Sequence, residues 1–365
     1  MKITSVKTIV VSIPYDYGAP PMLLGGRPRT TLDTLLVRVE TDGGLVGWGD
    51  AFGVTVWPVT REAIEQLVAP LCIGMDALDR PGLMQRLERS LYHFGRSGPL
   101  QYALSGLDIA LWDLQGKAER KPVHALIGPQ VSSRLPVYAS LLPYPNLELL
   151  GRYAARAVHD GYRHVKLHEK TPAAVAAARQ AIGHDVELMV DVNCAFDLEG
   201  AKAFACAIES SRPMWLEEPI FPPDDFAAIT ALSNSSRIPL ALGENVGNAS
   251  EFERLLGTAS GLTFAQPSAI KTGGITALVR VARAAQSVGV RLMPHSAYFG
   301  PGFLATMHVL STLDGAPVLE RFYCDLGAKL LGPGCDVTGG FVQVPDLPGL
   351  GFDPDPAVLA QFSVS

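Results

Sequence analysis

The chain has 365 residues, of which 48% are apolar and 18% charged, and its formal net charge is −6. This composition is typical of a globular protein with a large buried core, and the length suits one barrel of about 200–250 residues beside a smaller domain. The charge is not gathered in blocks, which argues against nucleic acid and anionic membranes as partners. No apolar run approaches the length of a membrane span.

The five cysteines are scattered and have no Cys-x-x-Cys spacing: Cys72, Cys194, Cys206, Cys324 and Cys335. They predict free thiols in a reducing compartment, not a disulfide framework or a zinc site. The segment Lys2–Ile13 alternates like a strand and lacks a signal-peptide core, so we expect a cytoplasmic protein.

The first fifty residues predict a small sheet, with strands at Lys2–Ile13 and Leu35–Val39 followed by a turn at 41–44. The segment Tyr15–Arg29 is rich in Gly and Pro, so we expect it to form no regular element and to cover the site as a mobile lid. A second such loop is expected at Phe52–Trp57.

Helical spacing of apolar residues begins near residue 60 and continues to about 126. The helix predicted at Ala103–Gly116 has Gly106 in its middle, close to Ala103 and Ala110. We expect this glycine to mark a close helix contact, not a break in the helix.

From about Leu135 onward, strand-like and helical segments alternate, and three apolar runs end on acidic residues, Asp191, Glu217 and Glu244. The first two acids are 26 positions apart and the last two 27, about the length of one βα unit. If the strands lie side by side in a barrel, the three carboxylates meet at its C-terminal mouth, where barrel active sites lie. They would repel one another without a cation, and oxygen ligands with room for water or substrate favour Mg²⁺.

The same period continues in both directions, with steps of 24 to 27 positions. The other strand ends carry Lys166 and His168, Ser268, His295, and Glu320. A single Asp or Glu of this kind would usually be a solvated loop residue. Seven strand ends in one register favour a common site instead.

These motifs resemble a known family. The helix Ala103–Gly116, then Val-Asp191-Val-Asn193, Trp-Leu-Glu217-Glu218-Pro, Gly-Glu244-Asn, Lys271-Thr-Gly-Gly and the tail Pro-Asp-Leu-Pro-Gly-Leu-Gly resemble the mandelate racemase/muconate lactonizing enzyme branch of the enolase superfamily. The resemblance implies an α/β protein, a modified (β/α)-barrel under an N-terminal α+β capping domain. We place the capping domain at 1–126, the barrel at 127–325, and a C-terminal segment that packs back on the capping domain at 326–365.

The resemblance also implies roles for individual residues. It makes Asp191, Glu217 and Glu244 the ligands of Mg²⁺, and Glu218 dispensable as a ligand. Asn193 and Lys271 are expected to orient the substrate or the site. Glu320 resembles the acid that hydrogen-bonds a substrate carboxylate oxygen, and Lys166 supplies positive charge. The implied reaction is abstraction of the proton α to a carboxylate, with an ene-diolate intermediate.

Two positions differ from the family pattern. The second strand usually presents Lys-x-Lys, whose second Lys is the base, and here it presents Lys166-Leu-His168. We expect His168 to be the base, held neutral by the nearby cation. On the opposite face, His295 is present but its usual Asp partner is Ser268. A hydroxyl stabilises imidazolium far less than a carboxylate does, so His295 should be the weaker base and act as the acid.

One base and one acid suit dehydration of an acid sugar, which is the reaction we expect, with a small-molecule carboxylate as substrate. A racemase or epimerase, or a sugar-lactone cycloisomerase, is the alternative within the superfamily. A non-catalytic barrel that only binds metal and ligand is the alternative of another class. Candidate substrate contacts from the lids are Tyr15, Trp57 and Arg27, and relatives suggest a homo-oligomer.

Overall fold

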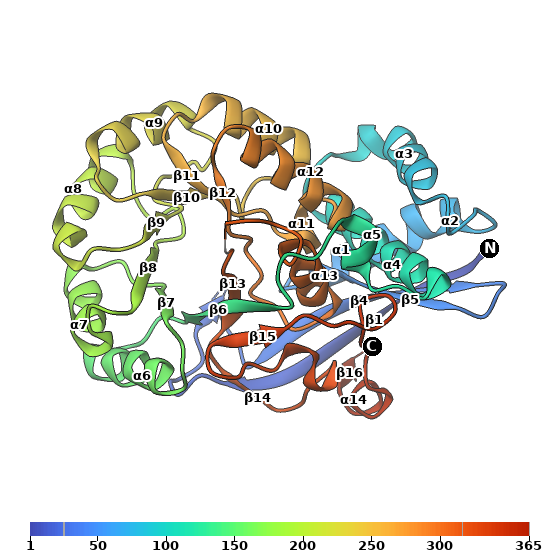
Figure 1. Ribbon diagram of the computed structural model, residues 1–365, viewed down its shortest axis with the longest axis horizontal. Helices are drawn as coiled ribbons and strands as arrows, with labels where there is room; N and C mark the ends of the chain where they lie inside the picture. The colour runs from blue at the N-terminus through green and yellow to red at the C-terminus, as the bar shows by residue number, and fades with distance from the viewer. Residues whose placement is uncertain (25, 316, 365) are drawn as a thin grey trace.

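The computed structural model describes residues 1–24, 26–315 and 317–364. Its larger part is a barrel of parallel strands in the order β12-β11-β10-β9-β8-β7-β6-β13 (Figure 1). The strands are β6 (Arg134–Leu141), β7 (His164–Leu167), β8 (Glu187–Asp191), β9 (Trp215–Glu217), β10 (Leu240–Leu242), β11 (Leu262–Ala265), β12 (Arg291–Leu292) and β13 (Leu319–Phe322). The last strand pairs with the first, so the sheet curves back on itself.

Helices follow each of the first seven strands, and those after the first five strands form the outer arc seen in Figure 1. They are α6 (Leu147–His159), α7 (Pro172–Ile182), α8 (Leu198–Ile208), α9 (Phe226–Ser235), α10 (Ala249–Thr258), α11 (Ala269–Thr272) with α12 (Gly274–Ser287), and α13 (Pro301–Leu310). A short η3 (Glu209–Ser211) follows α8. Five of these helices begin at Asn, Thr or Asp side chains that accept hydrogen bonds from the first turn, which is why each starts where it does: Asn146, Thr171, Asp197, Asp225 and Asn248.

Side chains fill the inside of the barrel, as a closed sheet of eight strands requires. One buried cluster contains residues that lie in most of the strands or directly next to them: Tyr138, Met189, Trp215, Ala241, Phe264, Met293 and Val318. The seam between β12 and β13 has no strand pairing among the described residues. Side chains bridge it instead, because Ser296 Oγ donates to the Glu320 carbonyl at 3.0 Å and Val318 N–H reaches Met293 Sδ at 3.3 Å.

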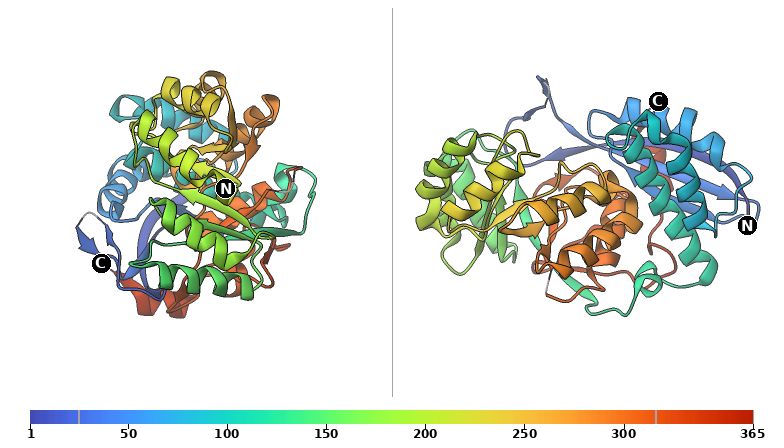
Figure 2. Two further views of the ribbon diagram at one scale, coloured as in Figure 1. Left: turned by 90° about the vertical axis from the view of Figure 1, so that its left-hand side faces the viewer. Right: turned by 90° about the horizontal axis from the view of Figure 1, so that it is seen from above.

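The smaller part is an antiparallel sheet of β1 (Ile3–Asp16), β4 (Thr31–Thr41) and β5 (Val46–Ala51), covered by helices on one face (Figure 2). The helices are α1 (Trp57–Glu62), η1 (Ala63–Val68), α2 (Ala69–Cys72), α3 (Arg80–Leu91), η2 (Tyr92–Phe94), α4 (Pro99–Glu119) and α5 (Val123–Ile127). The prediction for Gly106 is confirmed. A Cβ on it would lie 2.7 Å from Val37 Cγ2 and 3.0 Å from Ala51 Cβ, so only glycine lets α4 lie this close to the sheet. The predicted fold class, a modified (β/α)-barrel with an α+β capping domain, is also confirmed.

The C-terminal segment divides between the two parts. Its β14 (Asp325–Leu326) and β16 (Ser363–Val364) pair with β1 of the antiparallel sheet. Its β15 (Phe341–Gln343) pairs instead with β6 of the barrel. The remaining elements are η4 (Gly332–Cys335) and α14 (Pro356–Phe362). The domain limits at 126 and 325 stay predictions.

The expectation that Tyr15–Arg29 contains no regular element is wrong. Its tip is a hairpin in which β2 (Leu23–Leu24) pairs with β3 (Arg27–Pro28), and in Figure 2 this dark blue hairpin extends away from the body of the molecule. Gly26 has a φ of 77°, a conformation that tight hairpin turns need and glycine supplies, so the glycine content that argued against an element makes this one possible. The predicted cover over the site stays a prediction.

Two expectations from composition can be checked in the structure. The five cysteines are all free, as predicted. Among the helices of the described ranges, none is both long and apolar enough to cross a bilayer.

Candidate active site at the carboxyl ends of the barrel strands

The candidate site residues point into the barrel because of strand alternation. Four of them lie two positions after a side chain of the interior cluster: Asp191 after Met189, Glu217 after Trp215, His295 after Met293, and Glu320 after Val318. Successive side chains of a strand point to opposite faces, so residues two apart share a face. The interior packing therefore fixes the direction of the polar residues above it.

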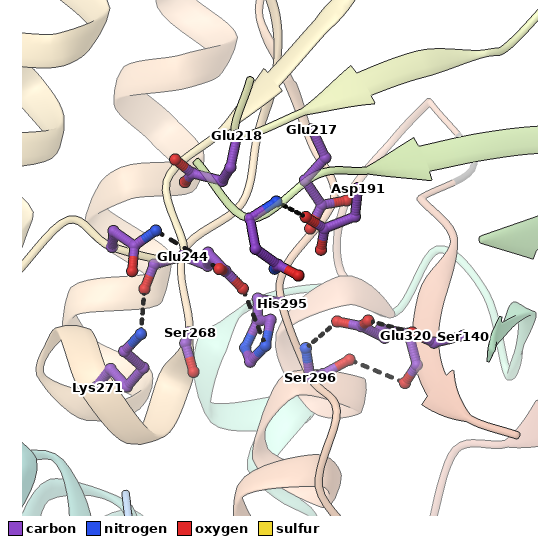
Figure 3. A network of polar contacts seen from close by, with 12 residues as sticks. Ser140, Asp191, Glu217, Glu218, Glu244, Ser268, Lys271, His295, Ser296 and Glu320 are labelled. Atoms are coloured by element: carbon purple, nitrogen blue, oxygen red, sulfur yellow. Dashed lines mark hydrogen bonds and ion pairs between the residues drawn. The ribbon is translucent and has the colours of Figure 1, made fainter. Parts of the chain in front are cut away.

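Asp191, Glu217 and Glu244 form the centre of the site (Figure 3). One carboxylate oxygen of each lies within 4.8 Å of the other two. Asp191 and Glu217 end adjacent strands and are paired in register, while Glu244 follows β10 by two residues. The first two are fully buried and Glu244 is half-buried, so one side of the cluster remains open.

The electrostatics of this cluster fit a divalent cation. Burial raises the pKa of Glu217 well above its usual range, and the charges of Asp191, Glu320 and Glu244 raise it further, against the opposing effect of Lys166. Three acids at this separation need added positive charge to remain ionised together. A donor set of carboxylate oxygens alone suits a hard cation such as Mg²⁺.

Lys166 is fully buried and lies between the acids. Its Nζ is 2.8 Å from Glu217 Oε1, 2.8 Å from Glu320 Oε1 and 3.4 Å from Asp191 Oδ2. Although burial opposes it, these acids raise the pKa of Lys166 well above its ordinary value. Lys166 is therefore a fixed positive charge that joins the metal-ligand cluster to Glu320.

His168 lies on the Asp191 side of the cluster. Its Nε2 is 3.3 Å from Asp191 Oδ2, and its Nδ1 is 2.7 Å from the carbonyl of Leu141. Burial and the charge of Lys166 lower the pKa of His168, but the charge and hydrogen bond of Asp191, together with the hydrogen bond to the Leu141 carbonyl, outweigh them, and the net shift is upward. The expectation that a neighbouring cation holds this histidine neutral stays a prediction. The two strands place the carboxylate closer to the ring than the spacing in sequence could reveal.

His295 lies on the opposite side, with Nε2 3.3 Å from Glu244 Oε2 (Figure 3). Its Nδ1 is buried and has no hydrogen-bond partner among the described residues, and the same holds for the hydroxyl of Ser268. Burial lowers the pKa of His295 despite the nearby Glu320 and Glu244. Within the described part of the chain no carboxylate contacts Nδ1 of this imidazole, which agrees with the serine at position 268.

Glu320 is held by two serines that the sequence analysis did not single out. Ser140 Oγ donates to its Oε1 at 2.8 Å, and the Ser296 N–H donates to its Oε2 at 3.0 Å. Burial is outweighed by Lys166, His295 and these donors, which lower the pKa of Glu320 to about 2. An ionised Glu320 accepts hydrogen bonds only, so the donor on this side is Lys166. Their places in the sequence could have revealed them, since Ser140 lies one residue before the end of β6 and Ser296 directly follows His295.

Asn193 and Lys271 contact the metal-ligand cluster through the backbone. The Asn193 N–H donates to Asp191 Oδ1 at 2.9 Å. The Lys271 Nζ donates to the main-chain carbonyl of Glu244, and its ammonium lies 5.1 Å from the centre of the Phe52 ring. Burial lowers the pKa of Lys271. Phe52 is a further residue that the sequence analysis missed, although it begins the second predicted lid.

Glu218 and Gln266 are buried beside the cluster. Glu218 Oε1 accepts the Gly243 N–H at 2.9 Å, and burial, followed by the charge of Glu244, raises the pKa of Glu218 to about 7. It is outside the ligand set, as expected. Both amide atoms of Gln266 lack a hydrogen-bond partner within the described residues, and the sequence analysis did not select this residue.

The structure does not bring the three predicted lid residues to this cluster. Tyr15 donates its hydroxyl to the Arg29 carbonyl, and Arg27 is exposed on β3. Trp57 begins α1 and packs on the core of the antiparallel sheet. Arg29, on the same predicted lid, lies 5.9 Å from the centre of the Phe322 ring, two residues beyond Glu320 on β13.

Comparisons with known families and proteins agree with the family resemblance seen in the sequence. Residues 7–128 match the mandelate racemase/muconate lactonizing enzyme N-terminal domain, and residues 150–358 match the enolase C-terminal domain-like family. The chain is 30% identical over 355 residues to D-galactonate dehydratase from Ralstonia nicotianae, an alignment that covers 91% of both proteins.

Two solved structures extend the comparison. The 3,6-anhydro-D-galactonate cycloisomerase from Zobellia galactanivorans is 28% identical with a TM-score of 0.89, covering 100% of both chains. A mandelate racemase/muconate lactonizing protein from Paracoccus denitrificans PD1222, crystallised with magnesium, is 27% identical with a TM-score of 0.87, covering 100% of this chain and 98% of that one. With its fold, its clustered strand-end acids and both domain matches, the chain belongs to the mandelate racemase/muconate lactonizing enzyme family of the enolase superfamily.

Proposed function

We propose that this protein is a Mg²⁺-dependent enzyme that removes the proton α to a substrate carboxylate and dehydrates an acid sugar. The observation that carries the proposal is the arrangement of two histidines on opposite ligands of one carboxylate cluster. His168 lies against Asp191 and His295 against Glu244, at 3.3 Å in both cases. A substrate bound at the open side of the cluster would have one imidazole on each flank.

Asp191, Glu217 and Glu244 would hold the ion, which when bound supplies positive charge to the substrate carboxylate and stabilises the charge that develops on it. Lys166 adds a second positive charge on the Glu320 side. Asn193 and Lys271 hold the ligands Asp191 and Glu244 through the contacts described above. A carbon acid next to a carboxylate is weak, so this concentration of positive charge is what the reaction requires.

In the proposed reaction His168 takes the α-proton at Nε2. Its Nδ1–H would donate to the Leu141 carbonyl, so the lone pair that takes the proton is on Nε2, and the Asp191 carboxylate 3.3 Å away would stabilise the imidazolium that forms. His295 carries its proton on Nε2, the nitrogen that faces Glu244 and the cluster. It gives that proton to the β-hydroxyl, whose C–O bond breaks to release water. The product enol then becomes a 2-keto acid.

The relatives support dehydration and leave one second candidate. The match to a D-galactonate dehydratase agrees with one base and one acid. The full-length likeness to a 3,6-anhydro-D-galactonate cycloisomerase favours cycloisomerisation of a sugar derivative as the alternative, since it could use the same two histidines. Racemisation is less favoured because His295 Nδ1 has no carboxylate partner among the described residues. The homo-oligomeric state stays a prediction.

A screen of aldonic acids, aldaric acids and their lactones with Mg²⁺ in D₂O tests the proposal. We expect loss of one substrate, formation of a 2-keto acid, and exchange of the α-proton for deuterium in the substrate that remains. Ring opening or closure without 2-keto acid would favour the cycloisomerase. Neither turnover nor exchange in a library that includes D-galactonate, with Mg²⁺ bound, would support the binding-only barrel.

A further inference from the structure

The segment Lys271-Thr-Gly-Gly joins α11 to α12 and lies against α4 of the antiparallel-sheet part. Gly273 and Gly274 have φ values of 125° and 75°, which favour glycine. A Cβ on Gly273 would lie 2.9 Å from Gln101 Nε2, and one on Gly274 would lie 2.6 Å from Asp108 Cβ. The glycine pair therefore allows both the turn and its close approach to α4.

Three side chains on one face of α4 hold this turn and the first turn of α12 that follows it. Gln101 Nε2 donates to the Thr272 carbonyl at 3.1 Å, and Ser105 Oγ accepts the Gly273 N–H at 2.8 Å. Asp108 accepts from Thr276 twice, from the N–H at 2.9 Å and from the hydroxyl at 2.5 Å. Ser105 and Asp108 are fully buried, so these bonds are not exchanged for water without cost.

The turn so held carries Lys271, whose ammonium donates to the main-chain carbonyl of Glu244. Phe52 adds a second support, because its N–H donates to the Ile270 carbonyl at 3.2 Å and its ring faces Lys271. Both supports come from the part of the chain that precedes the barrel. Glu244 is the least buried of the three acids and lies furthest beyond the end of its strand, so its position depends most on contacts of this kind.

We propose that Gln101, Ser105 and Asp108 of α4 are positioning residues that hold Glu244 in its metal-binding position through the 271–274 turn and Lys271. The capping domain then supports the metal site through α4, in addition to any cover that its loops give. This inference rests on the proposed metal site. It predicts that a substitution on α4, remote from the ion, weakens metal binding.

The test measures Mn²⁺ affinity of the full-length protein from the EPR signal of free Mn²⁺, without substrate. Asp108→Asn should raise the Kd about 10-fold, the lower end of what is lost when a residue that supports a metal ligand is changed. The matched control is Asp113→Asn, a buried acid on the same helix that accepts the backbone N–H groups of Trp48 and Leu350, at 2.9 and 2.8 Å, away from the turn. It should lower Tm and leave Kd within about 2-fold.

A double-variant comparison tests the route through Lys271. Lys271→Met should itself weaken Mn²⁺ binding, and adding Asp108→Asn to it should change Kd little further, because coupled residues are not additive. Full additivity would overturn the route. If Asp108→Asn does not fold, Ser105→Ala takes its place as the milder loss of one acceptor. A wild-type Kd in whichever α4 variant folds would overturn the inference, whereas a wild-type protein that binds no Mn²⁺ would overturn the metal site itself.

Discussion

The barrel mouth and the lid differ in how their side chains are positioned. At the mouth, Asp191 and Glu217 end neighbouring parallel strands and are paired in register, above interior side chains that fix their direction. On the lid, Arg27 and Arg29 lie two residues apart, yet one is exposed on a hairpin and the other lies beside Phe322. Strand register carries a spacing in sequence into space, and a loop does not. The site is therefore best tested by pairs of similar residues, of which only one is placed to act.

The largest expected effect separates Glu217 from its neighbour Glu218. Glu217→Gln should remove turnover, by about 10³-fold or more, because one of three ligand charges is lost at the centre of the site. Glu218→Gln is the control, since a glutamine still accepts the Gly243 N–H, and it should remain active. The measurement is kcat together with Mn²⁺ affinity. Full activity and affinity in Glu217→Gln would contradict the ligand assignment.

The two histidines should differ in which half of the reaction they support. His168→Ala should lose α-proton exchange in D₂O and product formation together, each by about 10²–10⁴-fold, the range of general acid–base catalysis. His295→Asn should lose product and keep exchange, because the proton taken by His168 does not depend on it. Deuterium incorporation and 2-keto acid formation are followed in the same sample. Loss of exchange in His295→Asn alone would reverse the two roles.

The lid pair should show a smaller effect on substrate binding. Arg29→Met should raise KM about 10-fold, because Arg29 lies above Phe322 at the mouth. This is the factor expected from the loss of one hydrogen bond to a charged group. Arg27→Met should change KM less than about 2-fold, as is usual for an exposed charge. Mn²⁺ affinity should be unchanged in both. Equal KM values for the two variants would show that Arg29 does not face the substrate.

The smallest expected effect concerns stability where the capping domain meets the barrel. Burial raises the pKa of Asp50 from 3.8 to about 7, although the Gly302 N–H donates to it. From about pH 4 to 7 the folded protein keeps this proton and the unfolded chain releases it, so the Asp50 contribution to the free energy of unfolding falls as pH rises. The full penalty, at most about 4 kcal/mol, is present above pH 7.

Asp50→Asn should remove this dependence. The variant should gain stability over wild type as pH rises from 5 to 8, measured by urea unfolding at both values. A difference between the two proteins that does not change with pH would contradict the shifted pKa. Glu62→Gln, at an exposed position of α1, provides a control in which little change is expected.

The sequence by itself determined the barrel and the ring of strand-end residues. A period of 24 to 27 positions places Lys166, Asp191, Glu217, His295 and Glu320 at one end of a parallel sheet, because each βα unit returns the chain to the same edge. It also indicated that His295 would lack a carboxylate partner, and the unpartnered Nδ1 agrees. Local composition likewise sufficed for Gly106, where only a close approach explains a glycine inside a helix.

Only the tertiary structure decided the distances between these residues and the contacts of the other side chains that support them. The upward shift in the pKa of His168 depends on its 3.3 Å distance from Asp191, which spacing along the chain does not give. The support of Glu320 by Ser140 and of Thr276, in the first turn of α12, by Asp108 joins residues 180 and 168 positions apart. Such contacts form where separately folded elements pack together, and no local pattern records them.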